Sequence, residues 1–217
     1  MIPIQDVIPS RQRPWATLAI VSAMAAGLVC AWFVSPDAIR GLVYGYGWTG
    51  AQLWWLFPVP AFLHLSLVHA GTNMLALWIF GDTMEDRLGH ARFAALYALG
   101  AIVSWTVVVA THPVTAMPGI GAGGAVAAVI GAYLAQLPRS RVLVLVPLPF
   151  VFDLVEIPAA IVPAFWCLLQ IIGVAGSGGG VTAAAQVLWA IGAGGLTGAG
   201  VGWALRGKRP EWEMPWT

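Results

Sequence analysis

Two histidines and an asparagine lie close together in one apolar segment, and they are the first residues whose types and spacing could do chemistry. His64 and His69 are followed by Asn73, and a spacing of four places His69 and Asn73 on one face of a helix. Polar groups in an apolar environment are costly unless they face a partner or a hydrated cavity. The spacing alone supports either structural hydrogen bonds between helices or a path for an ion or a small molecule.

A charged stretch follows this segment, from Gly81 to Gly89, and it contains Glu85 and Arg87. We expect it to be a solvated turn at a helix end, in which these two side chains satisfy backbone groups of the loop. A structural role is therefore favoured over a catalytic one.

The composition excludes the usual classes of soluble protein. The chain has 217 residues, of which 59% are hydrophobic and only 9% charged, with a mean hydropathy of +0.83. An ordinary soluble domain has about 25% charged residues. The net charge of +1 and the absence of a basic run exclude nucleic acid as a main partner. Cys30 and Cys167 lie in apolar runs, so we expect core residues rather than a disulfide or a metal site, and no cofactor.

The apolar segments are sufficient for six transmembrane helices, since about 20 apolar residues cross a bilayer. We therefore predict an all-α membrane protein. The expected spans are Trp15–Val34, Pro60–Phe80, Ala91–Ala110, Gly124–Leu137, Val155–Ile172 and Gln186–Leu205. Residues 35–59 are rich in Tyr and Trp and are expected to form a loop at the membrane interface. The short run Val142–Val146 is expected to be an interfacial connector.

The Lys and Arg residues indicate which side of the membrane each loop faces. With six spans, nine of the ten lie on one side, and only Arg40 lies on the other. Because cytoplasmic loops carry the excess of Lys and Arg, both termini are expected in the cytoplasm, at a bacterial-type inner (plasma) membrane. The first apolar run is interpreted as a retained helix. The expected domains are a cytoplasmic segment at 1–14, a transmembrane domain at 15–205 and a cytoplasmic tail at 206–217.

Several short motifs occur in an order that resembles the rhomboid family of intramembrane serine proteases. They are H-x-x-x-x-H-x-x-x-N from His64 to Asn73, G-D-x-x-E-D-R-L-G-x-x-R-F from Gly81 to Phe93, P-G-I-G-A-G-G-A from Pro118 to Ala125, G-A-Y at 131–133, R-V-L and V-P within 141–147, Trp166, W-A at 189–190 and G-G at 194–195. The resemblance covers about residues 10 to 205. It implies a compact rhomboid-like bundle of six transmembrane helices, with an interfacial first loop and a short fourth helix.

Both members of the family's catalytic dyad are missing from this sequence. The family uses a Ser in a G-x-S-G turn at the start of the fourth helix and a His on the sixth helix, while a His and an Asn of the second helix help to hold the oxyanion. The resemblance places Gly123 at the nucleophile position and Gly192 at the base position. Only the oxyanion residues, which correspond to His69 and Asn73, remain.

A displaced nucleophile is the remaining route to protease activity. No Ser, Thr or Cys lies in the range 118–135, and no His follows position 112. Ser66 and Ser104 lie on the second and third expected helices, where neither precedes a helix start that would aim its hydroxyl at a base. We therefore expect no enzyme activity. An intramembrane serine-type endopeptidase with a displaced nucleophile is the alternative hypothesis.

Glycines recur along the fourth and sixth expected helices at intervals that favour close packing. They are Gly121, Gly124 and Gly131 on the former, and Gly194, Gly198 and Gly202 on the latter. Small residues on facing sides let the backbones of two membrane helices approach closely. The pattern predicts direct contact between these two helices rather than a ligand pocket.

The function predicted from these observations is binding without cleavage. A rhomboid-like bundle that has lost its dyad keeps the lateral opening that admits a helix. We therefore predict a pseudoprotease that binds transmembrane helices of its partners as a scaffold, an assembly factor or a subunit of a larger membrane complex. The expected partners are membrane lipids and other integral membrane proteins. The aromatic residues expected to bind them are Trp48, Trp54, Trp55, Trp212 and Trp216.

Overall fold

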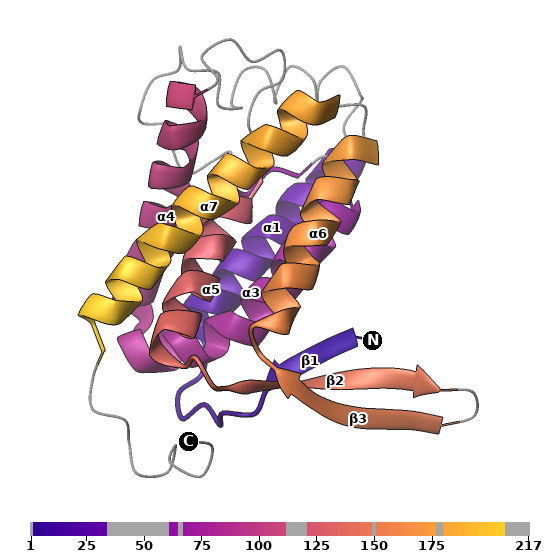
Figure 1. Ribbon diagram of the computed structural model, residues 1–217, viewed down its shortest axis with the longest axis vertical. Helices are drawn as coiled ribbons and strands as arrows, with labels where there is room; N and C mark the ends of the chain where they lie inside the picture. The colour runs from indigo at the N-terminus through magenta and orange to yellow at the C-terminus, as the bar shows by residue number, and fades with distance from the viewer. Residues whose placement is uncertain are drawn as a thin grey trace.

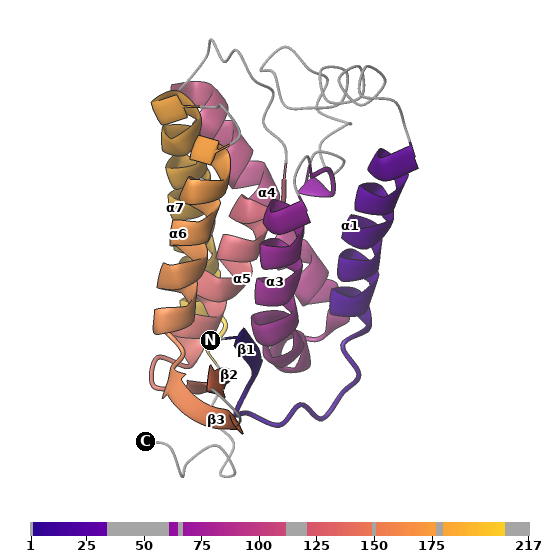
Figure 2. The same cartoon turned by 90° about the vertical axis from the view of Figure 1, so that its right-hand side faces the viewer.

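The computed structural model describes residues 2–33, 61–64, 67–111, 121–148, 151–176 and 180–206. Within these residues, helices stand side by side in a bundle and a small sheet lies at one end of it (Figure 1). In chain order the elements are β1 (Ile2–Asp6), α1 (Trp15–Phe33), α3 (Leu67–Leu88), α4 (His90–Thr111), α5 (Gly123–Gln136), β2 (Arg141–Leu148), β3 (Val151–Pro158), α6 (Ile161–Gly176) and α7 (Gly180–Ala204). Figure 2 shows α1 beside α3 at one side of the bundle, with α6 and α7 at the other.

Helices α1, α4 and α5 confirm three expected apolar segments to within a residue at each end. The last helix begins earlier than expected, at Gly180 rather than Gln186. Two described ranges, His90–Thr111 and Val181–Ala204, are long and apolar enough to cross a membrane by their length and composition. Helix α5 is shorter and nearly all of its residues are buried, so its neighbours enclose it within the bundle.

Helix α3 begins later than the expected segment, at Leu67 rather than Pro60, and extends beyond its expected end at Phe80. It continues through the charged stretch to Leu88 and ends at Gly89, whose φ of +76° lies in the left-handed region that suits glycine. The Gly89 N–H donates a hydrogen bond to the Glu85 carbonyl at 2.8 Å, which completes the last turn. The prediction of a solvated turn at 81–89 is therefore wrong. Thr83, Met84 and Glu85 are instead buried positions of a helix.

A three-stranded antiparallel sheet is the main departure from the expected all-α fold. Its strand order is β1-β2-β3, and β2 pairs with β3 from Arg141↔Pro158 to Leu148↔Val151. The span expected at Val155–Ile172 is wrong at its start, because Val155 belongs to β3 and α6 begins only at Ile161. The connector expected at Val142–Val146 is part of β2. Hydropathy alone does not distinguish a short apolar strand from a piece of buried helix.

The sheet is attached to the bundle through one face of β2. Val142 and Val144 are buried in the same apolar cluster as Phe80 of α3 and Tyr133 of α5. Residues that alternate along a strand point to the same face, so this pair directs one side of the sheet toward the helices. Strand β3 forms the outer edge, where Leu154 is half exposed.

Two carboxylates of α3 hold the segment between β1 and α1. The Glu85 carboxylate accepts hydrogen bonds from the backbone N–H groups of Ala16 and Thr17, both at 2.7 Å. These N–H groups belong to the first turn of α1, where no helical partner exists and a negative charge is favoured. The Asp86 carboxylate accepts a further bond from the Gln12 N–H at 2.9 Å. The start of α1 is thereby fixed to the end of α3.

Asp6 connects β1 to the helices from a buried position. Its carboxylate accepts hydrogen bonds from the hydroxyl of Thr83 at 2.6 Å and from that of Tyr133 at 3.0 Å. Burial disfavours the charged form more than these bonds favour it, and raises the pKa of Asp6 to about 6. The strand is therefore linked to both α3 and α5.

Helices α5 and α7 pack with almost no side chains between them. A Cβ added at Gly194 would overlap the carbonyl oxygen of Gly124, and one added at Gly198 would overlap that of Ala128. The direct contact that the glycine pattern predicts is therefore confirmed. Gly121 is not part of this contact, since it lies against His69.

Candidate functional site

A chain of hydrogen bonds crosses the interior of the bundle and includes the asparagine that the sequence singles out. The Gln170 amide of α6 donates to Thr72 Oγ1 at 3.0 Å and to Asn73 Oδ1 at 3.4 Å. The Asn73 amide nitrogen in turn lies 3.2 Å from His64 Nε2. Asn73, Gln170 and His64 are all buried. Both ends of the Asn73 amide are therefore occupied by partners within the described part of the chain.

His64 joins this chain to the start of α5. The Ala122 N–H donates to His64 Nε2 at 3.4 Å, on the same nitrogen that Asn73 approaches. A nitrogen that accepts two hydrogen bonds carries no proton, so the proton belongs on Nδ1, which faces the Phe62 carbonyl at 3.3 Å. His64 is thus a neutral bridge between the loop before α3 and the turn before α5.

His69 lies against the turn that leads into α5. Its ring meets that of His64 edge to face, with 5.1 Å between the ring centroids. Gly121, at the start of this turn, has a φ of +107°, and a Cβ added there would lie 2.7 Å from His69 Cε1. Glycine is therefore required both by the backbone and by the imidazole. The structure brings His64, His69 and Asn73 together around the turn that precedes Gly123.

The two dyad positions inferred from the sequence occupy different surroundings. A Cβ added at Gly123, the first residue of α5, meets no atom within 4 Å among the described residues outside its own helix backbone and chain neighbours. Gly192 is exposed, and a Cβ added there also meets nothing within 4 Å. The α7 face toward α5 contains Ala190 and Gly194, which are buried. Because Gly192 lies between them on the opposite side of the helix, a side chain at this position would point away from α5.

Ser104 is one of the two serines proposed from the sequence as a displaced nucleophile. It lies within the described residues, beside α5 and α7. Its Oγ donates to the Gly100 carbonyl of its own helix at 2.5 Å, and it is packed against Gly124 and Gly194. A nucleophilic hydroxyl needs an adjacent base, and none of these described contacts supplies one. Ser66, the other candidate, lies outside the described residues.

Glu85 and Arg87 both connect helices, rather than satisfying backbone groups of their own loop as expected. Glu85 is only 1% exposed, and besides the α1 backbone it contacts the His90 ring. Arg87 Nη1 donates to Gln136 Oε1 at 3.3 Å, which ties the end of α3 to the end of α5. The solvated environment expected for Glu85 is wrong, because its carboxylate is buried against the backbone that it caps.

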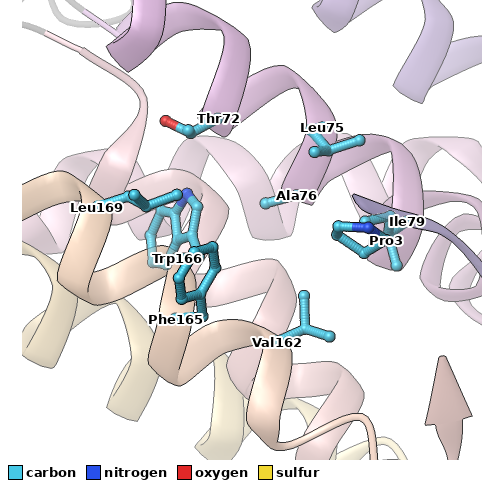
Figure 3. A pocket seen from close by; sticks show the side chains of 9 residues that line it. All are labelled: Pro3, Thr72, Leu75, Ala76, Ile79, Val162, Phe165, Trp166 and Leu169. Atoms are coloured by element: carbon cyan, nitrogen blue, oxygen red, sulfur yellow. The ribbon is translucent and has the colours of Figure 1, made fainter. Parts of the chain in front are cut away.

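A lateral pocket opens between α3 and α6 (Figure 3). Its volume is about 180 Å³, and its lining is apolar apart from the Thr72 hydroxyl. Leu75 and Ile79 of α3 face Phe165 and Trp166 of α6, and Pro3 of β1 lies at the far end from Thr72 (Figure 3). The hydrogen bond from Gln170 to Thr72 joins the two helices at the polar end of this pocket.

The five tryptophans expected to bind partners, Trp48, Trp54, Trp55, Trp212 and Trp216, lie outside the described residues. So does the expected interfacial loop at 35–59.

Gln170 and Asp6, in contrast, were not singled out from the sequence. The only signal for Gln170 was an amide within an apolar segment, and Asp6 carried none, since a carboxylate near a terminus usually faces water.

Comparison with proteins of known sequence identifies several relatives. The chain is 29% identical over 136 residues to presenilin-associated rhomboid-like protein A, mitochondrial, of Danio rerio, and 36% identical over 95 residues to rhomboid protein 1, mitochondrial, of Saccharomyces cerevisiae. It is 29% identical over 119 residues to the putative rhomboid protease YdcA of Bacillus subtilis. These matches cover 60%, 41% and 55% of this chain, and 35%, 27% and 56% of the relatives. The chain thus spans about a third of the first relative's length.

The family comparison covers most of the chain. The model of the Rhomboid domain matches residues 50–208, which include α3 to α7 and the turn before Gly123. The matched range also includes the hydrogen-bonded cluster of His64, Asn73 and Gln170, and every lining residue of the pocket except Pro3. The chain belongs to the rhomboid family.

Proposed function

We propose that this chain is a non-catalytic rhomboid-like membrane protein, which binds transmembrane helices of partner proteins as a scaffold, an assembly factor or a subunit of a larger complex. The observation that carries the proposal is Gly123, which the resemblance assigns to the position of the nucleophile and which has no hydroxyl. No His occurs anywhere on α7, so the helix that would supply the base offers none. Glycine can replace neither group.

A second observation concerns Asn73, which corresponds to an oxyanion residue of the family, and the position of the base on α7. The Asn73 amide is bonded to His64 and Gln170, and so is committed to structural hydrogen bonds. On α7 we propose that Ile191, rather than Gly192, occupies the position of the base, because it is partly buried against the core while Gly192 is exposed. Neither side chain can accept a proton.

The pocket between α3 and α6 supports the binding half of the proposal. It opens sideways from the bundle, and its apolar lining suits side chains of a transmembrane helix. Several large apolar side chains are exposed on α6 itself, including Phe165 and Leu168. In a membrane protein such surface contacts lipid or another helix. Membrane lipids and integral membrane proteins are therefore the proposed partners.

The proposed topology has six transmembrane spans with both termini in the cytoplasm of a bacterial-type inner membrane. It is supported by the distribution of Lys and Arg, nine of which fall on one side. In this orientation the sheet and the ends of α3 and α5 that carry Arg87 and Arg139 face the cytoplasm.

Co-purification from native membranes tests the proposed function. Solubilised in a mild detergent, the tagged chain is expected to carry membrane proteins in fixed stoichiometry. The acidic and aromatic tail is a proposed docking element, so deletion of residues 210–217 should weaken this association while the bundle stays folded. Replacement of the final Thr217 by Ala serves as the control. Recovery of the chain alone would argue against a subunit role. Unchanged stoichiometry after the deletion would argue against the tail as a docking element.

Protease activity through a displaced nucleophile is the second candidate, favoured by the likeness to a putative rhomboid protease of Bacillus subtilis. A fluorophosphonate probe, which labels activated serine hydroxyls, separates the two functions. We expect no labelling of the purified chain. Labelling that disappears in a Ser66→Ala or Ser104→Ala variant would establish the protease instead.

A further inference from the structure

Strand β1 is held to the rest of the molecule by few contacts. It pairs with β2 along one edge, and the register shifts between Pro3 and Gln5. Such a bulge interrupts the regular ladder of hydrogen bonds, and Pro3 has no N–H to add to it. Ile4 and Gln5 are exposed, and Asp6 is the one buried residue in the range 3–6. The docking of β1 therefore depends strongly on the Asp6 carboxyl group.

The chain is fixed to the bundle again a short distance after β1. The Asp86 carboxylate of α3 accepts hydrogen bonds from the backbone N–H groups of Arg11 at 3.2 Å and Gln12 at 2.9 Å. The first turn of α1 is bonded to Glu85 of the same helix. These bonds do not involve β1, so residues 2–6 can leave the sheet without displacing α1. Release of β1 is therefore a local step, distinct from unfolding of the bundle.

The docked position of Asp6 suits the neutral form of its side chain. Asp6 is 8% exposed, and the hydroxyls of Thr83 and Tyr133 both donate to its Oδ2. Burial raises the pKa of Asp6 to about 6, and repulsion by Asp82 of α3 acts in the same direction, whereas the two hydroxyls and the Ile8 N–H lower the pKa. The carboxylate is therefore less stable in the docked strand than in water.

Other charged groups on the elements around Asp6 are directed to partners of their own. On α3, Glu85 caps α1, and Arg87 donates to Gln136 of α5. On β2, Arg141 Nη1 lies 3.7 Å from Glu156 Oε2 of β3. The groups that favour the charged form of Asp6 are thus hydroxyl and amide donors.

We propose that β1 is a proton-controlled strap, which docks against the bundle when Asp6 is protonated and is released, with the bundle intact, when Asp6 is ionised. Pro3 lines the end of the pocket between α3 and α6 that lies opposite Thr72 (Figure 3). Release takes Pro3 out of this lining and leaves β2 with a free edge where β1 had paired. In the proposed topology the sheet faces the cytoplasm, so acidification of that compartment tightens the strap.

The direction and the size of the effect follow from the two pKa values of Asp6. A carboxyl group whose pKa is raised on docking adds stability that is complete below the pKa of the released strand and is lost as the pH rises through the pKa of the docked strand. Between the ordinary value of 3.8 and the docked value of about 6, the docking equilibrium should fall by about 100-fold.

Nitroxide labels on the full chain in phosphatidylcholine nanodiscs test this proposal. With Cys30 and Cys167 replaced by Ser, Gln5→Cys carries the label on β1, and Leu154→Cys carries a control label on β3 of the same sheet. The electron paramagnetic resonance spectrum separates an immobile, docked component from a mobile, released one. The ratio of mobile to immobile label at position 5 should rise about 100-fold from pH 4 to pH 7, while position 154 should stay unchanged.

Substitutions then assign the effect to Asp6. Asp6→Asn keeps an oxygen acceptor but does not ionise, so the ratio at position 5 should no longer depend on pH. Asp153→Asn on exposed β3 is the matched control and should keep the original response. Asp82→Asn removes a repulsion and should move the midpoint of release to lower pH, a shift that a purely structural role of Asp82 would not produce. If Asp6→Asn does not fold, this shift remains a sufficient test.

Three results would overturn the strap. A label at position 5 that stays immobile up to pH 8 would show that β1 is not released. A mobile component that appears at position 154 at the same pH would show that the sheet unfolds together with β1. A pH response that is unchanged in both Asp6→Asn and Asp82→Asn would assign it to another group. None of these results bears on whether the chain binds or cleaves a partner.

Discussion

Asn73 is a residue type that can take part in catalysis, but its amide bonds to His64 and Gln170 and so holds helices together. The sequence reveals His64, His69 and Asn73 because polar side chains stand out in an apolar segment. It does not reveal Gln170, which lies 97 residues from Asn73 in the chain. Spacing within a helix predicts which side chains share a face, and carries no information about contacts between distant segments. His64, His69 and Asn73 were therefore predictable from the sequence, whereas Gln170 and the hydrogen bonds between these residues were not.

Removal of the Asn73 amide should destabilise the bundle moderately. Hydrogen bonds between membrane helices contribute about 0.6 kcal/mol on average and less than about 2 kcal/mol each, so we expect Asn73→Ala to lower the free energy of unfolding by roughly 1–2 kcal/mol. Thr106→Ala is the matched control, since this exposed hydroxyl bonds only within its own helix. Thermal unfolding in detergent measures both. Equal stability of Asn73→Ala and the wild type would show that the hydrogen-bond chain is not structural.

The buried carboxylate of Asp6 should make stability depend on pH. Its pKa of about 6 in the folded state exceeds the ordinary value of 3.8, so the folded protein keeps a proton that the unfolded chain loses between these values. The stabilisation is complete below about pH 4 and is lost as the pH rises through 6, by up to roughly 3 kcal/mol. Nearby Asp82 adds to the effect by repulsion.

Asp6→Asn keeps an oxygen that can accept from Thr83 but does not ionise, and should flatten the stability profile between pH 4 and pH 6. Asp153→Asn, on the exposed edge of β3, is the control and should retain the wild-type slope. Unfolding midpoints across this pH range decide the matter. A wild-type slope in Asp6→Asn would assign the effect to another group.

At the scale of elements, helices were more predictable than strands. The long apolar runs of α1 and α4 need no tertiary context to be recognised, because they match the thickness of a bilayer. The second half of β3 was expected to be the start of a membrane span, since residues 155–158 lead directly into the apolar run of α6. In the sheet β2 pairs with both β3 and β1, which joins residues 141–158 to residues 2–6, and a local pattern does not contain such long-range pairing.

The contact between α5 and α7 yields a test with a control on the same helix. Gly198→Ala places a methyl group onto the carbonyl oxygen of Ala128, and overpacking of this kind costs roughly 1–3 kcal/mol. Gly200→Ala meets no atom within 4 Å and should be neutral or slightly stabilising, because alanine favours the helix. Thermal unfolding of the two variants should therefore separate them. Similar stability of both would show that the helices do not pack through Gly198.

At the scale of the whole molecule, the sheet end and the opposite end of the bundle should face different sides of the membrane. Arg139 is exposed between α5 and β2, whereas Phe33 is exposed at the other end of α1. In a chain with Cys30 and Cys167 replaced by Ser, Arg139→Cys should react with an impermeant maleimide only in inverted vesicles. Phe33→Cys should react in intact spheroplasts. The reverse pattern would contradict the proposed orientation.

The family could be inferred from the order of short motifs, and the match over residues 50–208 establishes it. The proposed function rests on a few positions, above all Gly123, and it uses the lateral pocket between α3 and α6. A scaffold built in this way should engage a transmembrane helix and release it uncut.

Incubation with a transmembrane peptide in proteoliposomes tests this claim most directly. The peptide should be one that an active rhomboid protease cleaves under the same conditions, and mass spectrometry of the liposomes after chemical crosslinking follows both its integrity and its association. The account predicts intact peptide, a part of it crosslinked to the chain, and no fragments at any time. Fragments that accumulate with time and are suppressed by a fluorophosphonate would contradict it.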